Sequence, residues 1–400
     1  MIRPRFGGTL RSGFPFPLRA IIITDHRLRG GGMINRREFG AGLVGIGIAP
    51  RSLPRNELAS PQESRKNTLM HVGGDYHNIV GGDITSKQNL EYNLRHGVKH
   101  ITAEISMNPQ GAWDPSDLQR MKDNCDKYGV VFEAIRMNSH YINKLRKGAE
   151  RDREIDIIVG NIRKAANIGV KIITYHCEVI PYRRNGKTPG RGGTACDSFK
   201  LEDDWKNVPM GDEGRVTHED YWERITYFLE KVIPAAKEND VRMACHPADP
   251  PGLPFGYQGV DEWASPAIFE AIKRYESIVE SPYNGFQLDL GNAAAGSRNP
   301  ATDVPPIVEY LGHRGKIHQI HMRNIRGRLN NFYEVFPDEG DVDFSKVMRI
   351  LRDTQFSGAI CPDHMPSHPD DPGGFQAFAF GYGYVKALIQ AVNSEVRGSY

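Results

Sequence analysis

The sequence predicts an eightfold (β/α) barrel, the TIM-barrel class of α/β fold, for residues 67–400. Eight short apolar runs, rich in β-branched or aromatic residues, alternate with longer segments of helical period. This alternation indicates parallel strands joined by crossover helices, and eight such units are enough to close a barrel. In addition, each of the last four runs has a histidine or an aspartate as its last or second-last residue, as expected for a barrel whose active site lies at the C-terminal ends of its strands.

The expected strands follow one another along the chain. They are residues 69–72, 101–106, 130–135, 171–176, 242–246, 285–290, 316–322 and 358–363. Helical spacing of apolar residues is clear in 152–168 and 218–238, and Thr217 with Asp220 predicts an N-cap for the second of these. The alternative is a doubly wound open sheet. It is disfavoured because no G-x-G-x-x-G follows the first strand, and because four consecutive strands end in site-like residues.

Composition agrees with one catalytic domain. A chain of 400 residues with 39% hydrophobic content can bury the core of a barrel with insertions. The 51 basic and 49 acidic residues nearly cancel, which gives no electrostatic case for nucleic acid as a partner. No stretch reaches the roughly 18 apolar residues of a membrane span. We expect the basic loop at 182–191 to be a solvated connection rather than an anion-binding loop.

The first 66 residues are expected to be a disordered extension that does not belong to the barrel. The run Asn35-Arg36-Arg37-Glu38-Phe39, followed by small and apolar residues 40–49, resembles a twin-arginine export signal spanning 33–55. Met33 lies just ahead of it and is a candidate natural start. We therefore expect export to the periplasm. The alternative is a basic tail with a chance arginine pair and a cytoplasmic location.

The five cysteines do not indicate a disulfide framework. Their number is odd and none forms a C-x-x-C motif. Cys245 and Cys361 lie inside expected strands, next to candidate site residues, and we expect both to pack as small buried side chains.

Four candidate metal ligands end the last four strands. They are His246, Asp289, His321 and Asp363. A barrel brings the C-terminal ends of its strands to one mouth, so these side chains should converge there. Two imidazoles and two carboxylates suit Mn²⁺ or Fe²⁺, while Mg²⁺ and Zn²⁺ stay open as alternatives. Asp289 could instead cap a short helix at 291–295, and His318 should face the other side of its strand.

Five motifs together resemble the mannonate dehydratase family of the xylose-isomerase-like barrels. They are H-P-x-D-P-P at 246–251, N-G-F at 284–286 leading to Asp289, H-x-R-N at 321–324, D-E-G-D-x-D at 338–343 and P-D-H at 362–364. The similarity covers most of the chain after about residue 70. It implies a metal-dependent carbon–oxygen lyase that converts D-mannonate to 2-keto-3-deoxy-D-gluconate and water, with the four candidate ligands holding the metal.

The resemblance also suggests roles beyond the metal. His364, directly after Asp363, would be the catalytic acid or base. Arg323, with Asn324, would bind the sugar acid, because the guanidinium fork matches a carboxylate; the alternative for Arg323 is an ion pair with Asp338 or Glu339. The list of candidate substrate contacts is completed by two residues near strand ends, Glu104 and His176.

Two departures from the family pattern keep other functions open. The family has a cysteine at the position of Asp289, and a tyrosine in the segment after P-D-H, where this chain reads Met365-Pro366. The carboxylate favours, as an alternative, a sugar isomerase, epimerase or lyase of the same superfamily. The missing tyrosine supports a third reading, a sugar-acid binding protein without catalysis. The sequence leaves open whether the chain forms a homo-oligomer.

Overall fold

The structure is a computed structural model that describes residues 69–78, 81–138 and 149–397. The expected export signal and N-terminal extension lie outside these residues. No helix of the described part is long and apolar enough to cross a lipid bilayer.

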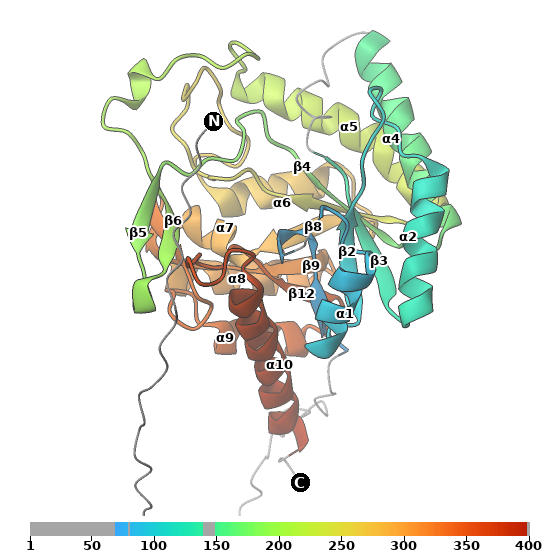
Figure 1. The fold of residues 1–400 in the computed structure, drawn as a ribbon. Helices are drawn as coiled ribbons and strands as arrows, with labels where there is room; N and C mark the ends of the chain where they lie inside the picture. Colours follow the sequence, from blue (N-terminus) through green and yellow to red (C-terminus); the bar gives the residue numbers. More distant parts are fainter. Residues whose placement is uncertain (1–68, 79–80, 139–148, 398–400) are drawn as a thin grey trace, which may run out of the picture. The chain divides into compact units, whose positions relative to one another are not determined.

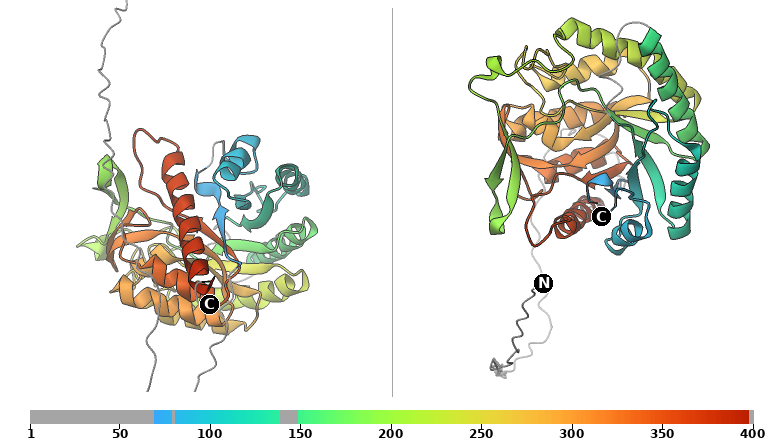
Figure 2. Two further views of the ribbon diagram at one scale, coloured as in Figure 1. Left: turned by 90° about the horizontal axis from the view of Figure 1, so that it is seen from below. Right: turned by 45° about the horizontal axis from the view of Figure 1, so that its top comes forward.

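Eight parallel strands close into a barrel, which confirms the predicted fold (Figures 1 and 2). Their order around the barrel is β1-β12-β9-β8-β7-β4-β3-β2. Each strand overlaps one predicted run, with ends that differ by at most two residues. The strands are β1 His71–Gly74, β2 His100–Glu104, β3 Val131–Arg136, β4 Ile172–His176, β7 Arg242–His246, β8 Asn284–Asp289, β9 Ile317–Met322 and β12 Ala359–Pro362.

Helices follow the barrel strands. They are α1 Lys87–Arg95, α2 Pro115–Tyr128, α4 Ala149–Asn167, α5 His218–Glu238, α6 Ile268–Ile278, α7 Leu290–Ala295, α8 Pro300–His313, α9 Phe344–Asp353 and α10 Phe375–Arg397, with 3-10 turns η1 Tyr76–Asn78, η2 Arg191–Gly193 and η3 Trp205–Asn207. The predicted cap of α5 is confirmed as a reciprocal pair. Thr217 Oγ1 accepts the Asp220 N–H at 3.1 Å, and Asp220 Oδ2 accepts the Thr217 N–H at 3.3 Å.

A second, antiparallel sheet was not predicted. Its order is β10-β11-β6-β5, with bounds β5 Gly186–Pro189, β6 Ala195–Lys200, β10 Asn324–Arg328 and β11 Asn331–Val335. Strands β5 and β6 lie on the opposite side of the barrel from α2 and α4 (Figures 1 and 2). The segment 182–191 is largely exposed, as predicted, but it is not a plain loop, because β5 lies within it and the Arg184 side chain is only 5% exposed. The short strand β5 has no apolar alternation, so periodicity could not reveal it.

A layer of buried polar side chains lies beneath the C-terminal mouth of the barrel. Gln319 donates to Thr102 Oγ1 at 2.7 Å, and Gln287 donates to Gln319 Oε1 at 2.6 Å and to His321 Nε2 at 2.8 Å. Buried polar groups that are paired in this way hold one another in place. The layer therefore orients His321 from below. Cys245 and Cys361 are buried in their strands, as expected.

A glycine permits close packing between β8 and β9. A Cβ at Gly285 would lie 2.4 Å from His318 Nε2 and 2.5 Å from the Lys316 carbonyl oxygen, and the carbonyl belongs to backbone that cannot swing away. Gly160 in α4 is a matched control, because nothing lies within 4 Å of a Cβ placed there.

We predict opposite effects for the same substitution at these two glycines. Gly285→Ala should lower the free energy of unfolding by about 1–3 kcal/mol through overpacking, whereas Gly160→Ala should raise it by about 1 kcal/mol through helix propensity. Urea denaturation followed by circular dichroism measures both. Equal midpoints for the two variants would contradict the packing described for β8 and β9.

Candidate metal centre and active site

A charged or imidazole side chain lies at the C-terminal end of every barrel strand. In barrel order from β1 these are Asp75, Asp363, His321, Asp289, His246, His176, Arg136 and Glu104. Because all eight strands are parallel, these residues share one mouth. The four predicted ligands come from the adjacent strands β7, β8, β9 and β12.

His321 is the centre of the candidate metal site. Its Nε2 lies 3.3 Å from Asp75 Oδ2, and its Nδ1 lies 3.4 Å from Asp363 Oδ2. On the other side, His246 Nε2 lies 3.3 Å from Asp289 Oδ2. Two groups of three, His246–Asp289–His321 and Asp75–His321–Asp363, each have ligand atoms within 4.8 Å of one another, and all five residues are buried. The four predicted ligands thus converge, and His321 belongs to both groups.

Buried carboxylate oxygens that face only imidazole rings indicate that this pocket can accept a cation. Both oxygens of Asp363 and Oδ2 of Asp75 are buried, make no well-aligned hydrogen bond with the described residues, and have only histidine nitrogens near them, at 3.2–3.5 Å. Burying charged oxygens without such partners is costly. Burial raises the pKa of both carboxyl groups, but neighbouring histidines outweigh it, and the pKa of Asp75 and of Asp363 lies below the ordinary value. The donor set of carboxylates and imidazoles fits a divalent ion.

Asp75 and His77 are site residues that the sequence reading missed. His77 Nδ1 lies 2.9 Å from Asp75 Oδ1, and its Nε2 lies 3.2 Å from Asp363 Oδ1. The expected first strand ended at Val72, so Asp75 lay three residues beyond it. The observed strand ends at Gly74. The other candidate ligands were predicted from their positions at the C-terminal ends of strands. If the end of the first strand had been placed correctly, the same argument would have predicted Asp75.

Asp289 caps α7 and also faces the candidate ligand group. Its Oδ1 accepts the Asn292 N–H at 3.0 Å and caps α7, so the capping interpretation is confirmed. Its Oδ2 faces His246 and lies 2.6 Å from Arg323 Nη2. The cap and the arginine fix the carboxylate in place without removing it from the ligand group.

Arg323 is held by three carboxylates of the protein. Besides Asp289, its Nη1 donates to Asp249 Oδ2 at 2.8 Å and to Glu334 Oε1 at 3.0 Å, and its side chain is fully buried. Arg184 pairs with the same two acids, at 3.0 Å from Asp249 Oδ1 and 2.6 Å from Glu334 Oε1. The guanidinium expected to bind substrate is therefore engaged within the protein. The predicted alternative, an ion pair of Arg323 with Asp338 or Glu339, is wrong, because these two acids pair with Arg191.

Asn324 holds a loop. Its amide nitrogen donates to the carbonyls of Pro337 and Val342 at 3.0 and 3.1 Å, and its oxygen accepts the Val342 N–H at 3.1 Å. A Cβ at Gly340 would lie 2.0 Å from the Asn324 amide group, so only glycine leaves room for it. The H-x-R-N and D-E-G-D-x-D motifs thus meet in one loop contact, and the amide expected to contact substrate serves this loop.

His364 lies between the ligand group and the second sheet. Its Nε2 is 3.5 Å from Asp363 Oδ1, its Nδ1 is 3.2 Å from Glu334 Oε2, and the Tyr182 hydroxyl lies 3.2 Å from the same Nδ1. Burial lowers the pKa of His364, but Asp363 and Glu334 outweigh it and raise this pKa to about 9. Its backbone φ of 46° lies in the left-handed region, a strained conformation that is often found at functional sites.

His176 and Glu104 lie at the same mouth, at the ends of β4 and β2. The His176 ring stacks on His246 with centroids 4.4 Å apart, and neither of its nitrogens has a hydrogen-bond partner among the described residues. Burial and the His246 charge lower the pKa of His176 to about 4. Glu104 lies 3.5 Å from Arg136. His176 can therefore accept a hydrogen bond, while Glu104 faces a neighbouring arginine.

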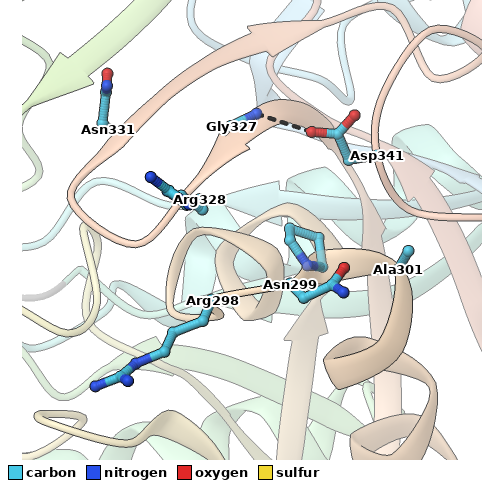
Figure 3. A pocket seen from close by; sticks show the side chains of 8 residues that line it. Arg298, Asn299, Ala301, Gly327, Arg328, Asn331 and Asp341 are labelled. Carbon is cyan, nitrogen blue, oxygen red and sulfur yellow. Dashed lines mark hydrogen bonds between the residues drawn. The ribbon is translucent and has the colours of Figure 1, made fainter.

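Other candidate positions fall outside this mouth. His318 packs against Gly285 and belongs to none of the candidate metal groups of the described residues. A surface pocket between the start of α8 and the β10–β11 hairpin is lined by Arg298, Asn299, Pro300, Ala301, Gly327, Arg328, Asn331 and Asp341 (Figure 3). It contains none of the predicted site residues.

Comparison with known proteins gives one consistent result. The family model described as D-mannonate dehydratase (UxuA) matches residues 83–199 and 209–399. A mannonate dehydratase of Thermotoga petrophila is 30% identical over 341 residues, 74% of this chain and 91% of that protein. Another, from Geobacillus thermodenitrificans, is 27% identical over 345 residues, 75% and 90% of the two chains.

Solved structures share the fold. The crystal structure of mannonate dehydratase from Streptococcus suis serotype 2 superposes with a TM-score of 0.68 at 24% identity, covering 82% of this chain and 96% of that one. A 3-keto-D-glucoside 4-epimerase from E. coli reaches 0.54 at 12% identity, covering 80% and 99%. At these sequence identities, the similarity to the two structures shows only that the barrel fold is shared.

We predict that loss of His321 or of His246 removes most bound metal. His321→Ala and His246→Ala should each lower the Mn²⁺ content after reconstitution, because alanine cannot fill the coordination position. His318→Asn is the matched control, since His318 is buried on the same strand but lies outside the ligand group. Elemental analysis gives the metal content. Full occupancy in His321→Ala would overturn the assignment.

Asp289→Cys tests one of the two carboxylates among the predicted ligands. A thiolate should raise the ratio of Zn²⁺ to Mn²⁺ affinity, because softer ligands favour zinc over manganese. Loss of the α7 cap should lower the free energy of unfolding by about 1 kcal/mol, and loss of a carboxylate partner of the buried Arg323 should lower it further. Asp289→Asn keeps the cap and separates the two effects. An affinity ratio unchanged from wild type in Asp289→Cys would show that this side chain does not touch the metal.

Proposed function

This chain belongs to the D-mannonate dehydratase family and is a lyase, and we propose that it converts D-mannonate to 2-keto-3-deoxy-D-gluconate and water with a bound divalent cation. The observation that supports this most directly is the buried group around His321, where carboxylate oxygens converge with only imidazole nitrogens beside them and without a well-aligned hydrogen bond. A sugar acid presents its own carboxylate and hydroxyl groups. Through these oxygens, such a substrate can bind to a cation held at this mouth.

The cation would be held by His246, Asp289, His321 and Asp363, and Asp75 extends the group on the β1 side. When bound, a divalent ion neutralises the charge that develops as the proton beside the carboxylate is removed. Mn²⁺ or Fe²⁺ suits the mixture of imidazoles and carboxylates best, and Mg²⁺ or Zn²⁺ stays open. Asp289 keeps its position whichever ion binds, because its capping hydrogen bond to α7 and its ion pair with Arg323 hold the carboxylate.

Dehydration requires a proton donor for the departing hydroxyl. The C–H bond beside the carboxylate breaks and its proton passes to a basic group at the mouth, while the neighbouring C–O bond breaks and the hydroxyl leaves as water after it gains a proton. The enol that forms takes up a proton at the carbon that lost the hydroxyl, releases its O–H proton and becomes the 2-keto acid. His364 is suited to supply the proton, because Glu334 and Asp363 favour its charged form and Tyr182 contacts its Nδ1.

Tyr182 provides a hydroxyl where the expected tyrosine after P-D-H is missing. It comes from the segment between β4 and β5, a different part of the chain. Its presence beside His364 removes the main support for a binding protein without catalysis. Arg323 acts in this proposal as a positioning residue, because it holds Asp289 and Glu334 rather than the substrate.

Product analysis tests the proposed reaction. Metal-reconstituted protein is incubated with a panel of hexonates and pentonates, and the products are identified by mass and by NMR. We expect loss of water, about 18 mass units, from D-mannonate. A product of unchanged mass would favour an isomerase or epimerase of the same superfamily, which the carboxylate at position 289 keeps in consideration. Binding without any turnover would contradict an enzyme.

We predict that His364→Asn separates catalysis from binding. Turnover should fall by about 10²- to 10⁴-fold, the range for a positioned acid or base, while metal content stays near that of wild type. Tyr182→Phe should cause a smaller loss, because the histidine remains. Tyr227→Phe, which changes a half-buried tyrosine that is bonded to Asp152 and lies far from His364 in sequence, is the control. A fall in metal content that parallels the fall in rate would make His364 a ligand instead.

A further inference from the structure

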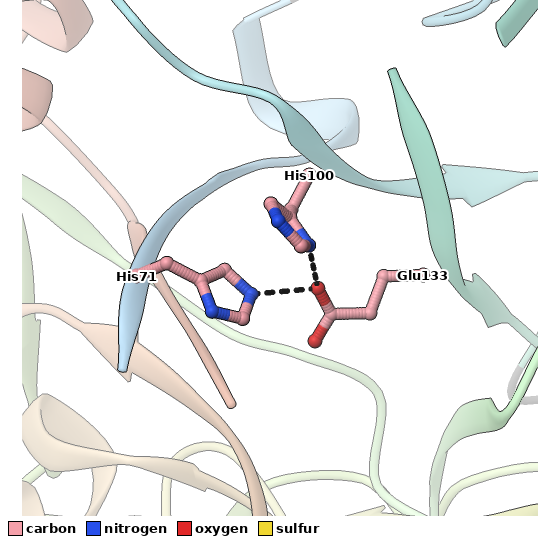
Figure 4. A group of neighbouring side chains, drawn as sticks. All are labelled: His71, His100 and Glu133. Atoms are coloured by element: carbon pink, nitrogen blue, oxygen red, sulfur yellow. Dashed lines mark hydrogen bonds and ion pairs between the residues drawn. The ribbon is translucent and has the colours of Figure 1, made fainter. Parts of the chain in front are cut away.

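A second group of metal-ligating side chains lies at the opposite end of the barrel (Figure 4). His71 and His100 are the first residues of β1 and β2, and Glu133 lies near the start of β3. A strand rises about 3.3 Å per residue, so His71 lies about 13 Å along the strand from Asp75. The group therefore belongs to the N-terminal mouth and is separate from the centre around His321.

The three side chains already meet at one point. His71 Nε2 lies 2.8 Å and His100 Nδ1 lies 2.7 Å from the same oxygen of Glu133, Oε2. The two imidazole rings lie against each other with centroids 3.7 Å apart. The side chains are 25%, 30% and 13% exposed, respectively for His71, His100 and Glu133. A cation in solution can therefore reach the group.

An irregularity in the barrel coincides with Glu133. Along the β2–β3 pairing, Ile101 is opposite Phe132 but the next residue, Thr102, is opposite Ala134, so Glu133 is the additional residue of a β-bulge. Bulges change the direction of the side chains at the rim of a barrel. The bulge and the two histidines together gather these ligands, which come from three successive strands.

The orientation of His71 is that of a metal ligand. Its Nδ1 lies 3.2 Å from the Leu69 carbonyl oxygen, which can only accept a hydrogen bond. With the Nδ1 proton directed at this carbonyl, Nε2 is the atom that faces Glu133 Oε2. A positive charge belongs between these two atoms. A proton on Nε2 supplies it in an ion pair, and a metal ion bound there would take the place of that proton. A backbone carbonyl that holds the far nitrogen is the usual arrangement behind a metal-bound histidine.

We propose that His71, His100 and Glu133 form a second cation site, selective for Zn²⁺ and similar ions, at the N-terminal mouth of the barrel. Two imidazoles and one carboxylate with a fourth position open to solvent is an established zinc donor set. Tetrahedral zinc with bonds of about 2.0–2.1 Å separates its ligand atoms by about 3.3 Å. The present contacts need to open by only about half an ångström to reach this separation.

The site would stabilise the closure of the barrel. Strand β1 pairs through two residues with β12 and through two with β2, so its attachment to the barrel is short. A cation bound by these ligands would connect β1, β2 and β3 directly. This inference does not depend on the proposed function, since none of its three ligands lies at the catalytic mouth.

Zinc titration of the metal-free full-length protein tests the site. We compare wild type with Glu133→Gln and with His71→Gln/His100→Gln by calorimetry. The variants should bind one equivalent of Zn²⁺ fewer than wild type and should lose the rise in Tm that zinc gives wild type. Their dehydratase turnover with Mn²⁺ should be unchanged. His313→Gln, which removes an exposed histidine at the end of α8, should behave as wild type.

Two results would overturn the proposal. One is an equal number of zinc equivalents, with equal affinity, in wild type and Glu133→Gln. The other is binding of the additional equivalent only at millimolar Zn²⁺, which marks adventitious association. Glu133→Gln preserves the size of the side chain. Its zinc stoichiometry therefore tests the site even when the double histidine variant does not fold.

Discussion

The pairing of two buried arginines with three carboxylates is the interaction on which the catalytic mouth depends. Arg184 and Arg323 share Asp249 and Glu334, and Arg323 also holds Asp289. Removing one partner from such a network leaves an uncompensated buried charge, which is strongly destabilising. The network fixes Asp289 beside His246, and it fixes Glu334 beside His364. It therefore couples the second sheet, which carries Glu334, to the ends of the barrel strands.

Much of this mouth could be predicted because one topological rule governs it. Residues at the C-terminal ends of parallel strands converge, so His246, Asp289 and His321 were identified from the ends of apolar runs. The rule missed Asp75, because the first run was placed two residues early. Arg184 could not be found in this way, since it belongs to a segment without periodicity and its partners come from distant parts of the chain. The ion-pair partners of Arg323 were misjudged for a related reason. Guanidinium geometry indicates a carboxylate partner, but only the fold shows that the protein itself supplies it.

The two mouths of the barrel differ in what surrounds their charged groups. At the C-terminal mouth, carboxylates and imidazoles are buried among long loops and the second sheet, where removal from water strengthens electrostatic interactions. At the N-terminal mouth, His71, His100 and Glu133 remain partly exposed and lie within the strands themselves. Chemistry therefore concentrates at the first mouth, while the second suits a stabilising role. This division is typical of TIM barrels.

The position of the catalytic cation is the central claim, and anomalous X-ray scattering from crystals grown with Mn²⁺ tests it most directly. The account predicts a manganese peak at the C-terminal mouth, within bonding distance of His321 and of at least one of Asp363 and Asp289. Electron density for a sugar acid soaked into the crystals should then adjoin the peak on the side of His364. A fully occupied manganese peak elsewhere on the protein, with none beside His321, would contradict the account.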